Sequence, residues 1–171
     1  MNTTRHDLAE RAWGFIFPRL DRWFLVRVAV VGAVAWGFFG GVCRPMRIHG
    51  ASMEPSWRDG GFTFCWRPAY WFRAPRRGDV VMIRFAGERV MLLKRVVALG
   101  GETVAFRDGI LLVDGEPLAE PHVQAPCDWQ MEPRTVGTGK FYVVGDNRAM
   151  PIDRHQFGEV HPGRIVGAPT W

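Results

Sequence analysis

The chain's strongest constraint is an apolar stretch at residues 23–43, WFLVRVAVVGAVAWGFFGGVC, whose single charge is Arg27. Its uninterrupted part, residues 28–43, would extend roughly 24 Å as an α-helix, slightly less than the ~30 Å hydrocarbon core of a bilayer. Arg27 can reach toward the headgroups and Trp23 can lie at the interface, so we expect a transmembrane anchor. Two alternatives stay open: a secretory signal cleaved after the Ala-Val-Ala of residues 33–35, and a buried core helix.

The distribution of charge indicates the topology. Residues 1–51 hold seven arginines against three acidic residues, whereas residues 52–171 hold 15 basic and 14 acidic residues. Because positive charge is enriched on the cytoplasmic side of an anchor, we expect the N-terminus in the cytoplasm and the following domain across the membrane. A nucleic-acid-binding protein would carry its excess charge on the folded domain. We therefore expect a lipid bilayer, and no nucleic acid, among the partners.

The remainder of the chain is typical of β-structure. Beyond residue 50, short β-rich runs alternate with turn residues, and the Asp-Gly pair at 108–109 predicts a two-residue hairpin. The Pro-rich segment 116–134 is expected to be a long loop. We predict a mainly β fold, an antiparallel sheet, sandwich or partly open barrel, in three parts: a cytoplasmic segment (1–22), the anchor (23–43) and a β-rich domain (44–171). The expected strands are 62–66, 79–85, 90–99, 103–107, 110–113 and 140–145.

Residues 64–73, FCWRPAYWFR, combine five aromatic side chains with two arginines. One interpretation is a half-buried strand followed by a turn. The other is an interfacial patch that rests the domain on the bilayer, since Trp and Tyr beside Arg suit that environment. The sequence alone leaves both open.

Serine and lysine are scarce: the chain has two serines, Ser52 and Ser56, and two lysines, Lys94 and Lys140, against twenty arginines. A desolvated lysine can lose its proton and act as a base, which arginine cannot do. Lys94 has apolar neighbours on both sides, whereas Lys140 follows a Gly-rich turn. Lys94 is thus the better candidate base, with an ordinary strand lysine reaching for solvent as the alternative.

Ser52 follows Gly50 and Ala51 and precedes Pro55, an arrangement that exposes a serine on a rigid turn, as a nucleophile requires. His49 is close enough in sequence to be its base or to be a surface histidine. The five histidines and three cysteines show no metal-ligand spacing, so we expect neither a metal nor another cofactor.

Four segments, in this order, resemble the sequence boxes of the bacterial type I signal peptidases, the Ser–Lys peptidases of family S26. They are the nucleophile box HGASMEPS (49–56), RGDVV (77–81), the lysine box LKRVVALGGE (93–102) and GDNR (145–148). The resemblance implies a membrane-bound endopeptidase that releases exported preproteins from their signal peptides at the outer face of the bacterial cytoplasmic membrane. Ser52 would be the nucleophile and neutral Lys94 its general base.

The same resemblance implies roles for further residues. The Ser52 N–H would form the oxyanion hole, with little side-chain help because Gly50 occupies a position where some members carry a hydroxyl. Family members cleave after small residues at −1 and −3, in shallow pockets. The expected substrate-binding residues are Ile48, Gly50, Met53 and Leu93, and those expected to brace the site are Asp146, Asn147, Arg148 and Asp153.

One segment departs from the family pattern. After GDNR, many members have a serine that bonds the catalytic lysine, followed by an Asp–Arg pair. Here Pro151 occupies the serine position, and the arginine is either shifted to Arg154 or replaced by His155. This departure keeps two alternatives open: a specialised conjugative pilin-maturing peptidase of the same clan, and a non-catalytic membrane-tethered β module that binds exported chains.

Overall fold

The computed structural model describes residues 21–86, 90–125 and 127–170. The chain divides into two compact units, one ending at Gly40 and the other beginning at Gly41. Each unit is described by itself below.

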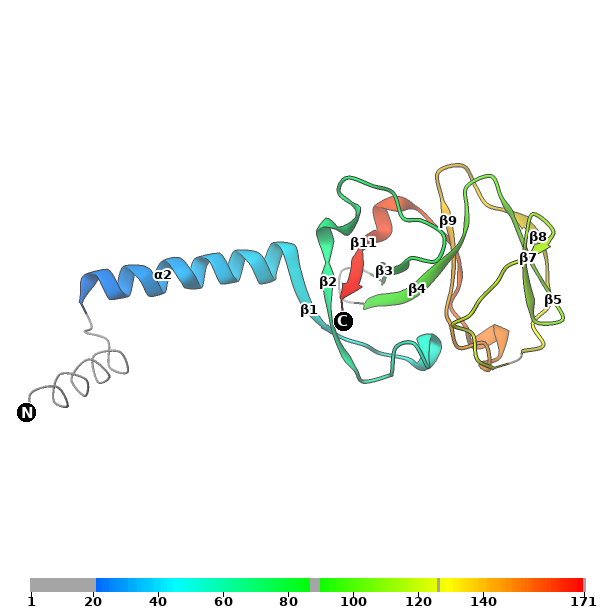
Figure 1. Cartoon of the computed structure of the whole chain (residues 1–171), viewed down its shortest axis with the longest axis horizontal. Helices are drawn as coiled ribbons and strands as arrows, with labels where there is room; N and C mark the ends of the chain where they lie inside the picture. Colours follow the sequence, from blue (N-terminus) through cyan, green and yellow to red (C-terminus); the bar gives the residue numbers. More distant parts are fainter. Residues whose placement is uncertain (1–20, 87–89, 126, 171) are drawn as a thin grey trace, which may run out of the picture. The chain divides into compact units, whose positions relative to one another are not determined.

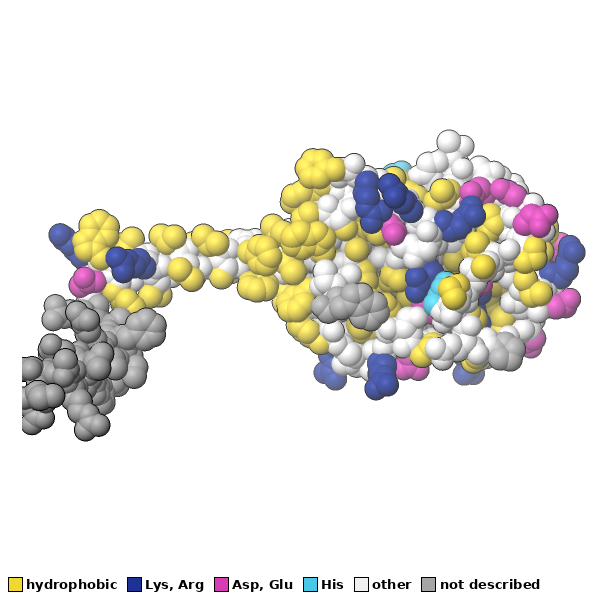
Figure 2. Space-filling model, in the orientation of Figure 1, with side chains coloured by type: hydrophobic (Ala, Val, Ile, Leu, Met, Phe, Trp, Pro, Cys, Tyr) yellow, Lys and Arg dark blue, Asp and Glu magenta, His cyan; other side chains and the backbone are white. Residues whose placement is uncertain are grey.

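The first unit contains a long apolar helix. Helix α2 (Arg22–Gly37) begins at Asp21, whose carboxylate accepts the Phe24 N–H at 2.7 Å, and it continues as the π-helical turn η1 (Phe38–Val42). Over its most apolar 18 residues, the helix from Arg22 to Val42 has a mean hydropathy of 1.8, and none of these residues is buried. Hydrophobic side chains cover the helix on the face seen in Figure 2. The expected helix that is apolar enough to span a membrane is therefore confirmed, and the buried-core alternative is wrong. Cys43, the last residue of the expected anchor, is the first residue of strand β1 (Cys43–Arg47).

The second unit is built on a seven-stranded antiparallel sheet (Figure 1). In spatial order its strands are β1 (Cys43–Arg47), β2 (Phe62–Trp66), β11 (Ile165–Thr170), β3 (Val80–Ala86), β4 (Val90–Leu99), β9 (Phe141–Val144) and β10 (Gly158–Val160). The C-terminal strand β11 pairs with both β2 and β3, which joins the two ends of the domain sequence.

A smaller four-stranded sheet lies beside β4 and β9 (Figure 1). The Asp108–Gly109 turn, with φ of 50° and 74°, connects two of its strands as the sequence predicts. Its spatial order is β7 (Glu116–Pro117), β6 (Ile110–Val113), β5 (Thr103–Arg107) and β8 (Met131–Thr135). Short helical turns η2 (Ala51–Met53), η3 (Arg67–Tyr70), η4 (Ile152–Arg154) and η5 (Pro162–Arg164) complete the unit.

The mainly β, antiparallel fold is confirmed, and it is arranged as two sheets. The expectation of a loop throughout residues 116–134 is wrong at both ends, where β7 and β8 pair with β6 and β5. The sequence analysis also missed β1, β10 and β11, which are held by strands distant in the chain.

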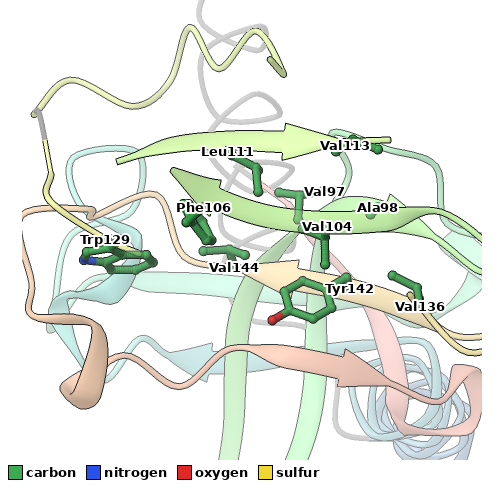
Figure 3. Packing of buried hydrophobic residues seen from close by; sticks show 10 residues of the cluster. All are labelled: Val97, Ala98, Val104, Phe106, Leu111, Val113, Trp129, Val136, Tyr142 and Val144. Atoms are coloured by element: carbon green, nitrogen blue, oxygen red, sulfur yellow. The ribbon is translucent and has the colours of Figure 1, made fainter. Parts of the chain in front are cut away.

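Two hydrophobic cores stabilise the sheets. In Figure 3, Val97, Val104, Tyr142 and Val144 point toward one another from β4, β5 and β9, which fastens the small sheet to the large one. A second core on the large sheet contains Val81, Ile83, Val96, Phe141, Val143 and Val160. Burying each such side chain contributes about 1.5–3 kcal/mol, so the strands that meet at these cores form a rigid base for the site.

Candidate active site

Ser52 lies on a short, rigid turn. It is the central residue of η2, and Gly50 before it has a φ of 93°, a backbone conformation that glycine adopts without strain. The Gly50 N–H donates to Asp59 Oδ1 at 2.8 Å. Beneath the turn, Met53 is buried with Ile48 and Trp57. The serine is therefore half-exposed on a turn that is fixed from below.

Lys94 reaches this serine from the large sheet. It lies on β4 opposite Val81 and is only 1% exposed, and its Nζ is 2.7 Å from Ser52 Oγ. Burial lowers the pKa of Lys94 from 10.5 to about 8, and the negative charge of Asp146 opposes this shift. A substantial fraction of Lys94 is therefore neutral near pH 8, in hydrogen-bond contact with a hydroxyl group. This is the geometry of a serine nucleophile beside its general base.

Asn147 binds the turn that carries Ser52. Its backbone N–H donates to the Ser52 carbonyl at 3.0 Å, and its side-chain Nδ2 donates to the Ala51 carbonyl at 2.9 Å. The GDNR segment therefore binds directly to the peptide units on both sides of the Ser52 α-carbon.

Asp146 is paired with Arg95, the chain neighbour of Lys94. Both of its carboxylate oxygens accept from Arg95, at 2.9 and 2.6 Å, and Arg95 also donates to the Gly78 carbonyl at 2.8 Å. Asp146 is fully buried at its side chain. Both oxygens thus accept hydrogen bonds from Arg95, and Asp146 acts on Lys94 through its charge.

Arg148, the last residue of the GDNR segment, is buried. It donates to both oxygens of Glu120, at 2.9 and 2.5 Å, and to the Gly145 carbonyl at 2.9 Å. Its guanidinium lies over the rings of Phe106 and Trp129, 5.2 and 5.6 Å from their centres. Arg148 therefore ties the GDNR turn to the segment carrying Glu120 and to the small-sheet core.

The chain matches one protein-family model, described as signal peptidase, peptidase S26, over residues 20–171. The chain belongs to this family. A probable signal peptidase I-1 of Synechocystis is 31% identical, over 91% of this chain and 81% of that protein. Signal peptidase I V of Bacillus subtilis is 31% identical, over 85% of this chain and 94% of that one. A solved signal peptidase I from Enterococcus faecalis superposes with a TM-score of 0.47 and 27% identity, over 57% of this chain and 98% of its own.

The structure brings most of the expected residues of this S26 peptidase together. Leu93 packs against the core of Ile48 and Met53, which are 4% and 1% exposed, so these three lie under the Ser52 turn. Gly50 is exposed beside them. Their contacts with substrate stay a prediction. Asp153 differs from the other expected bracing residues because it is exposed on η4.

Residues 149–155, which depart from the family pattern, bring His155 to the site of this S26 peptidase. Pro151 and Arg154 are exposed, whereas His155 is 5% exposed and lines a pocket together with Lys94. The sequence analysis left open whether Arg154 or His155 takes the place of the family arginine. Of the two, only His155 is buried at the site. The sequence also missed the Asn147 and Glu120 contacts, because they join segments far apart in the chain.

The three cysteines at 43, 65 and 127 are free. Cys65 is buried in β2, while Cys127 donates to the Gly109 carbonyl at 3.3 Å beside the small sheet. The pairing of Cys65 with Cys127 that an oxidising compartment would permit is therefore not formed in this structure.

Proposed function

We propose that the chain is a membrane-bound serine endopeptidase that removes signal peptides from exported preproteins through Ser52 and Lys94. The observation that carries this proposal is the 2.7 Å contact between Ser52 Oγ and the Nζ of a buried lysine. Membership of the signal peptidase family supports the substrate class.

The chemistry follows from the protonation of Lys94. Neutral Lys94 takes the proton from Ser52 Oγ as that oxygen attacks the scissile carbonyl carbon. The Ser52 N–H stabilises the oxyanion, and the resulting Lys94 ammonium gives its proton to the leaving amine. A water molecule, deprotonated by Lys94, then cleaves the acyl-enzyme ester and restores the Ser52 hydroxyl.

Cleavage after small residues, of the Ala-x-Ala type, is the expected specificity. An extended preprotein segment would bind by main-chain hydrogen bonds beside Leu93, with side chains at −1 and −3 turned toward Ile48, Gly50 and Met53. Ile48 and Met53 are buried beneath the turn, and a substrate side chain that meets them there would find room only for a small group. This packing supports selection for alanine-sized residues.

A lipid surface is the second proposed partner. On β2, Phe62 and Trp66 are 64% and 37% exposed on one face of the strand, and Trp71 and Phe72 after it are 59% and 94% exposed. We call these four residues the aromatic patch; Figure 2 shows hydrophobic side chains gathered over this region of the β-domain, around β1 and β2. Arg67 lies between Trp66 and Trp71 in the sequence and Arg73 follows Phe72, a composition that suits the headgroup interface.

The placement of the chain in the cell is the third part of the proposal. The apolar helix α2 crosses the bacterial cytoplasmic membrane once, with the N-terminus in the cytoplasm. The β-domain then lies on the outer face, where exported preproteins emerge. The arginines concentrated before the helix support this orientation.

The decisive experiment is cleavage of a model preprotein with Ala-x-Ala at its junction by the full chain in lipid or mild detergent. The wild type is expected to cut at that junction, and Ser52→Ala and Lys94→Ala are expected to be inactive. The chain supplies matched controls, since Ser56 and Lys140 are its other serine and lysine. Ser56→Ala and Lys140→Ala should cleave as the wild type does.

The outcomes separate the alternatives. Cleavage by Ser52→Ala would overturn the mechanism. If no form of the chain cleaves general preproteins, pilin precursors test the conjugative peptidase. Binding of preproteins without cleavage of either substrate would support the non-catalytic module.

A further inference from the structure

His155 is a buried histidine beside the dyad whose ring nitrogens are not hydrogen-bonded. It is 5% exposed, and neither Nδ1 nor Nε2 has a partner of hydrogen-bond geometry within the described residues. Burying a polar group without a hydrogen-bond partner carries a desolvation cost, which an apolar side chain of similar size would avoid. Such a group in a folded protein therefore calls for a functional explanation.

The His155 ring lies against the backbone of the nucleophile turn. A Cβ at Gly145 would stand 2.2 Å from the Ser52 carbonyl oxygen and 2.8 Å from His155 Nε2, so only glycine fits between them. On its other side the ring meets Trp129 edge-on, with centroids 4.8 Å apart. The imidazole is thus clamped between the small-sheet core and the peptide unit of Ser52.

His155 and Lys94 also line one pocket of about 260 Å³. The pocket wall contains apolar side chains of the large sheet, including Ile83, Leu92 and Val143, together with the charged residues Glu159 and Arg164. Within the described residues, Ser52 Oγ is the hydrogen-bond partner of Lys94 Nζ. The amine has further hydrogen-bonding capacity, and His155 brings nitrogen atoms to the same pocket.

The groups around His155 keep it uncharged at neutral pH. Burial lowers the pKa of His155 to about 4, the positive charges of Lys94 and Arg148 add to this shift, and the backbone of Asn147 and Ser52 opposes it. A positive charge on the ring would repel the Lys94 ammonium. Because that repulsion is mutual, a permanent cation at residue 155 would further lower the pKa of Lys94.

We propose that His155 is a positioning residue of the dyad, whose neutral ring holds the Ser52 peptide unit in place and supplies Lys94 with a polar, uncharged neighbour. The inference rests on the proposed peptidase function for its kinetic consequence only. In this proposal His155 provides the polar group beside Lys94 that a serine provides in many family members. Pro151, which occupies the position of that serine, is exposed and has no hydroxyl. This proposal predicts that a positive charge at residue 155 lowers the pKa of Lys94. It also predicts that loss of the ring nitrogens lowers kcat.

The first test measures the protonation of Lys94 without any substrate. The full chain in detergent is acetylated briefly with acetic anhydride at a series of pH values, and the modified lysines are quantified by peptide mass spectrometry. Lys140, which is exposed and paired with Glu159, is the internal reference. His155→Arg is expected to move the Lys94 midpoint down by about one pH unit, because a like charge disfavours the ammonium. His155→Gln, which stays neutral, should leave the midpoint in place.

A matched control adds the same charge elsewhere. His161 is exposed at the start of η5, and His161→Arg should leave the Lys94 midpoint unchanged. If His155→Arg also leaves it unchanged in a chain that melts like the wild type, the proposed coupling is wrong. This outcome does not depend on whether the chain cleaves preproteins.

The second test separates positioning from packing. His155→Phe keeps an aromatic ring without nitrogen, and kcat is expected to fall about tenfold, the scale of a slightly misplaced reacting group, while KM changes less than about twofold. His155→Gln restores hydrogen-bonding capacity and should recover most of kcat. A folded His155→Phe chain with wild-type kcat would overturn the proposal. Absence of cleavage by the wild type would instead contradict the proposed function and leave the acetylation result to decide this inference.

Discussion

Asn147 and Ser52 are joined backbone to backbone: the Asn147 N–H donates to the Ser52 carbonyl at 3.0 Å, while its side chain binds the preceding peptide unit at Ala51. The turn that carries Ser52 is consequently held by the GDNR segment, which lies almost a hundred residues away in the chain. The sequence analysis expected Asn147 to brace the site without identifying what it binds. Its contacts place it among the residues that determine where Ser52 points.

Asn147→Ala should lower activity more than stability. The change removes the bond to the Ala51 carbonyl but keeps the backbone bond, so the free energy of unfolding should fall by only about 1 kcal/mol. The effect on the rate should be larger, because a serine that can shift is less often aligned with the scissile carbonyl, and kcat is expected to fall about tenfold or more. Preprotein cleavage and thermal melting of the same samples test this. Gln130→Ala, which removes an exposed amide contact to Asp108, is the control and should retain full activity.

Cleavage should rise with pH through the titration of Lys94. The reactive form is the neutral amine, and burial lowers the pKa of Lys94 to about 8. The rate is therefore expected to increase about tenfold per unit below pH 8 and to level off above it. Lys94→Arg should abolish cleavage at every pH, because arginine stays protonated. A rate that is flat between pH 6 and 9 under single-turnover conditions would remove Lys94 from the role of base.

Lys94 should also make the folded state less stable at neutral pH. Its pKa is 10.5 outside the fold and about 8 within it, so the folded state binds the proton more weakly than the unfolded state. Stability therefore rises with pH between these two values, and below them the penalty is fully present. Lys94→Met should raise the free energy of unfolding at pH 7 by about 1–3 kcal/mol, and the gain should shrink toward pH 10.5. Urea denaturation at both pH values measures it, with Lys140→Met as the exposed control.

The aromatic patch should contribute to membrane binding independently of the anchor. Trp71 and Phe72 are the most accessible choice for substitution after β2, because both project from the surface. In a chain lacking residues 1–42, Trp71→Ser with Phe72→Ser should weaken binding to vesicles with anionic lipid by about tenfold or more, given about 25 cal/mol per Å² of apolar area. Ile110→Ser removes an exposed apolar residue of the small sheet and serves as control. Folding of each truncated chain is checked by circular dichroism before vesicle flotation. Equal flotation of both variants would contradict the role of the patch.

The fold was predictable where the signal is local. Strands β2 and β4 have the predicted bounds, since runs of β-branched and aromatic residues bounded by turns need no distant information. β11 reads Ile-Val-Gly-Ala-Pro-Thr, which lacks such a pattern, and it becomes a strand because β2 and β3 accept it on both sides. β8, in a Pro-rich segment, is recruited in the same way by β5.

The site shows the same division between local and distant information. The scarcity of serine and lysine, together with the family boxes, was enough to select Ser52 and Lys94. Other features of the site depend on which segments meet in three dimensions. They are the burial of His155, the pairing of Asp146 with Arg95 and the contacts of Asn147. His155 lies in a segment of mostly polar residues, and no sequence pattern there predicts that its side chain is only 5% exposed.

Asp146→Asn tests both electrostatic roles of this carboxylate. Arg95 would keep its bond to the Gly78 carbonyl but lose its two charged acceptors, and breaking a largely buried pair of this kind should cost about 2–4 kcal/mol of unfolding free energy. The negative charge that opposes the lowered pKa of Lys94 is removed at the same time. The acid limb of the pH–rate profile should therefore move to lower pH in whatever fraction of the variant remains folded. Glu159→Gln breaks the exposed pair with Lys140 and should change neither quantity measurably. A shift of the acid limb to higher pH in Asp146→Asn would contradict this account of how Lys94 is tuned.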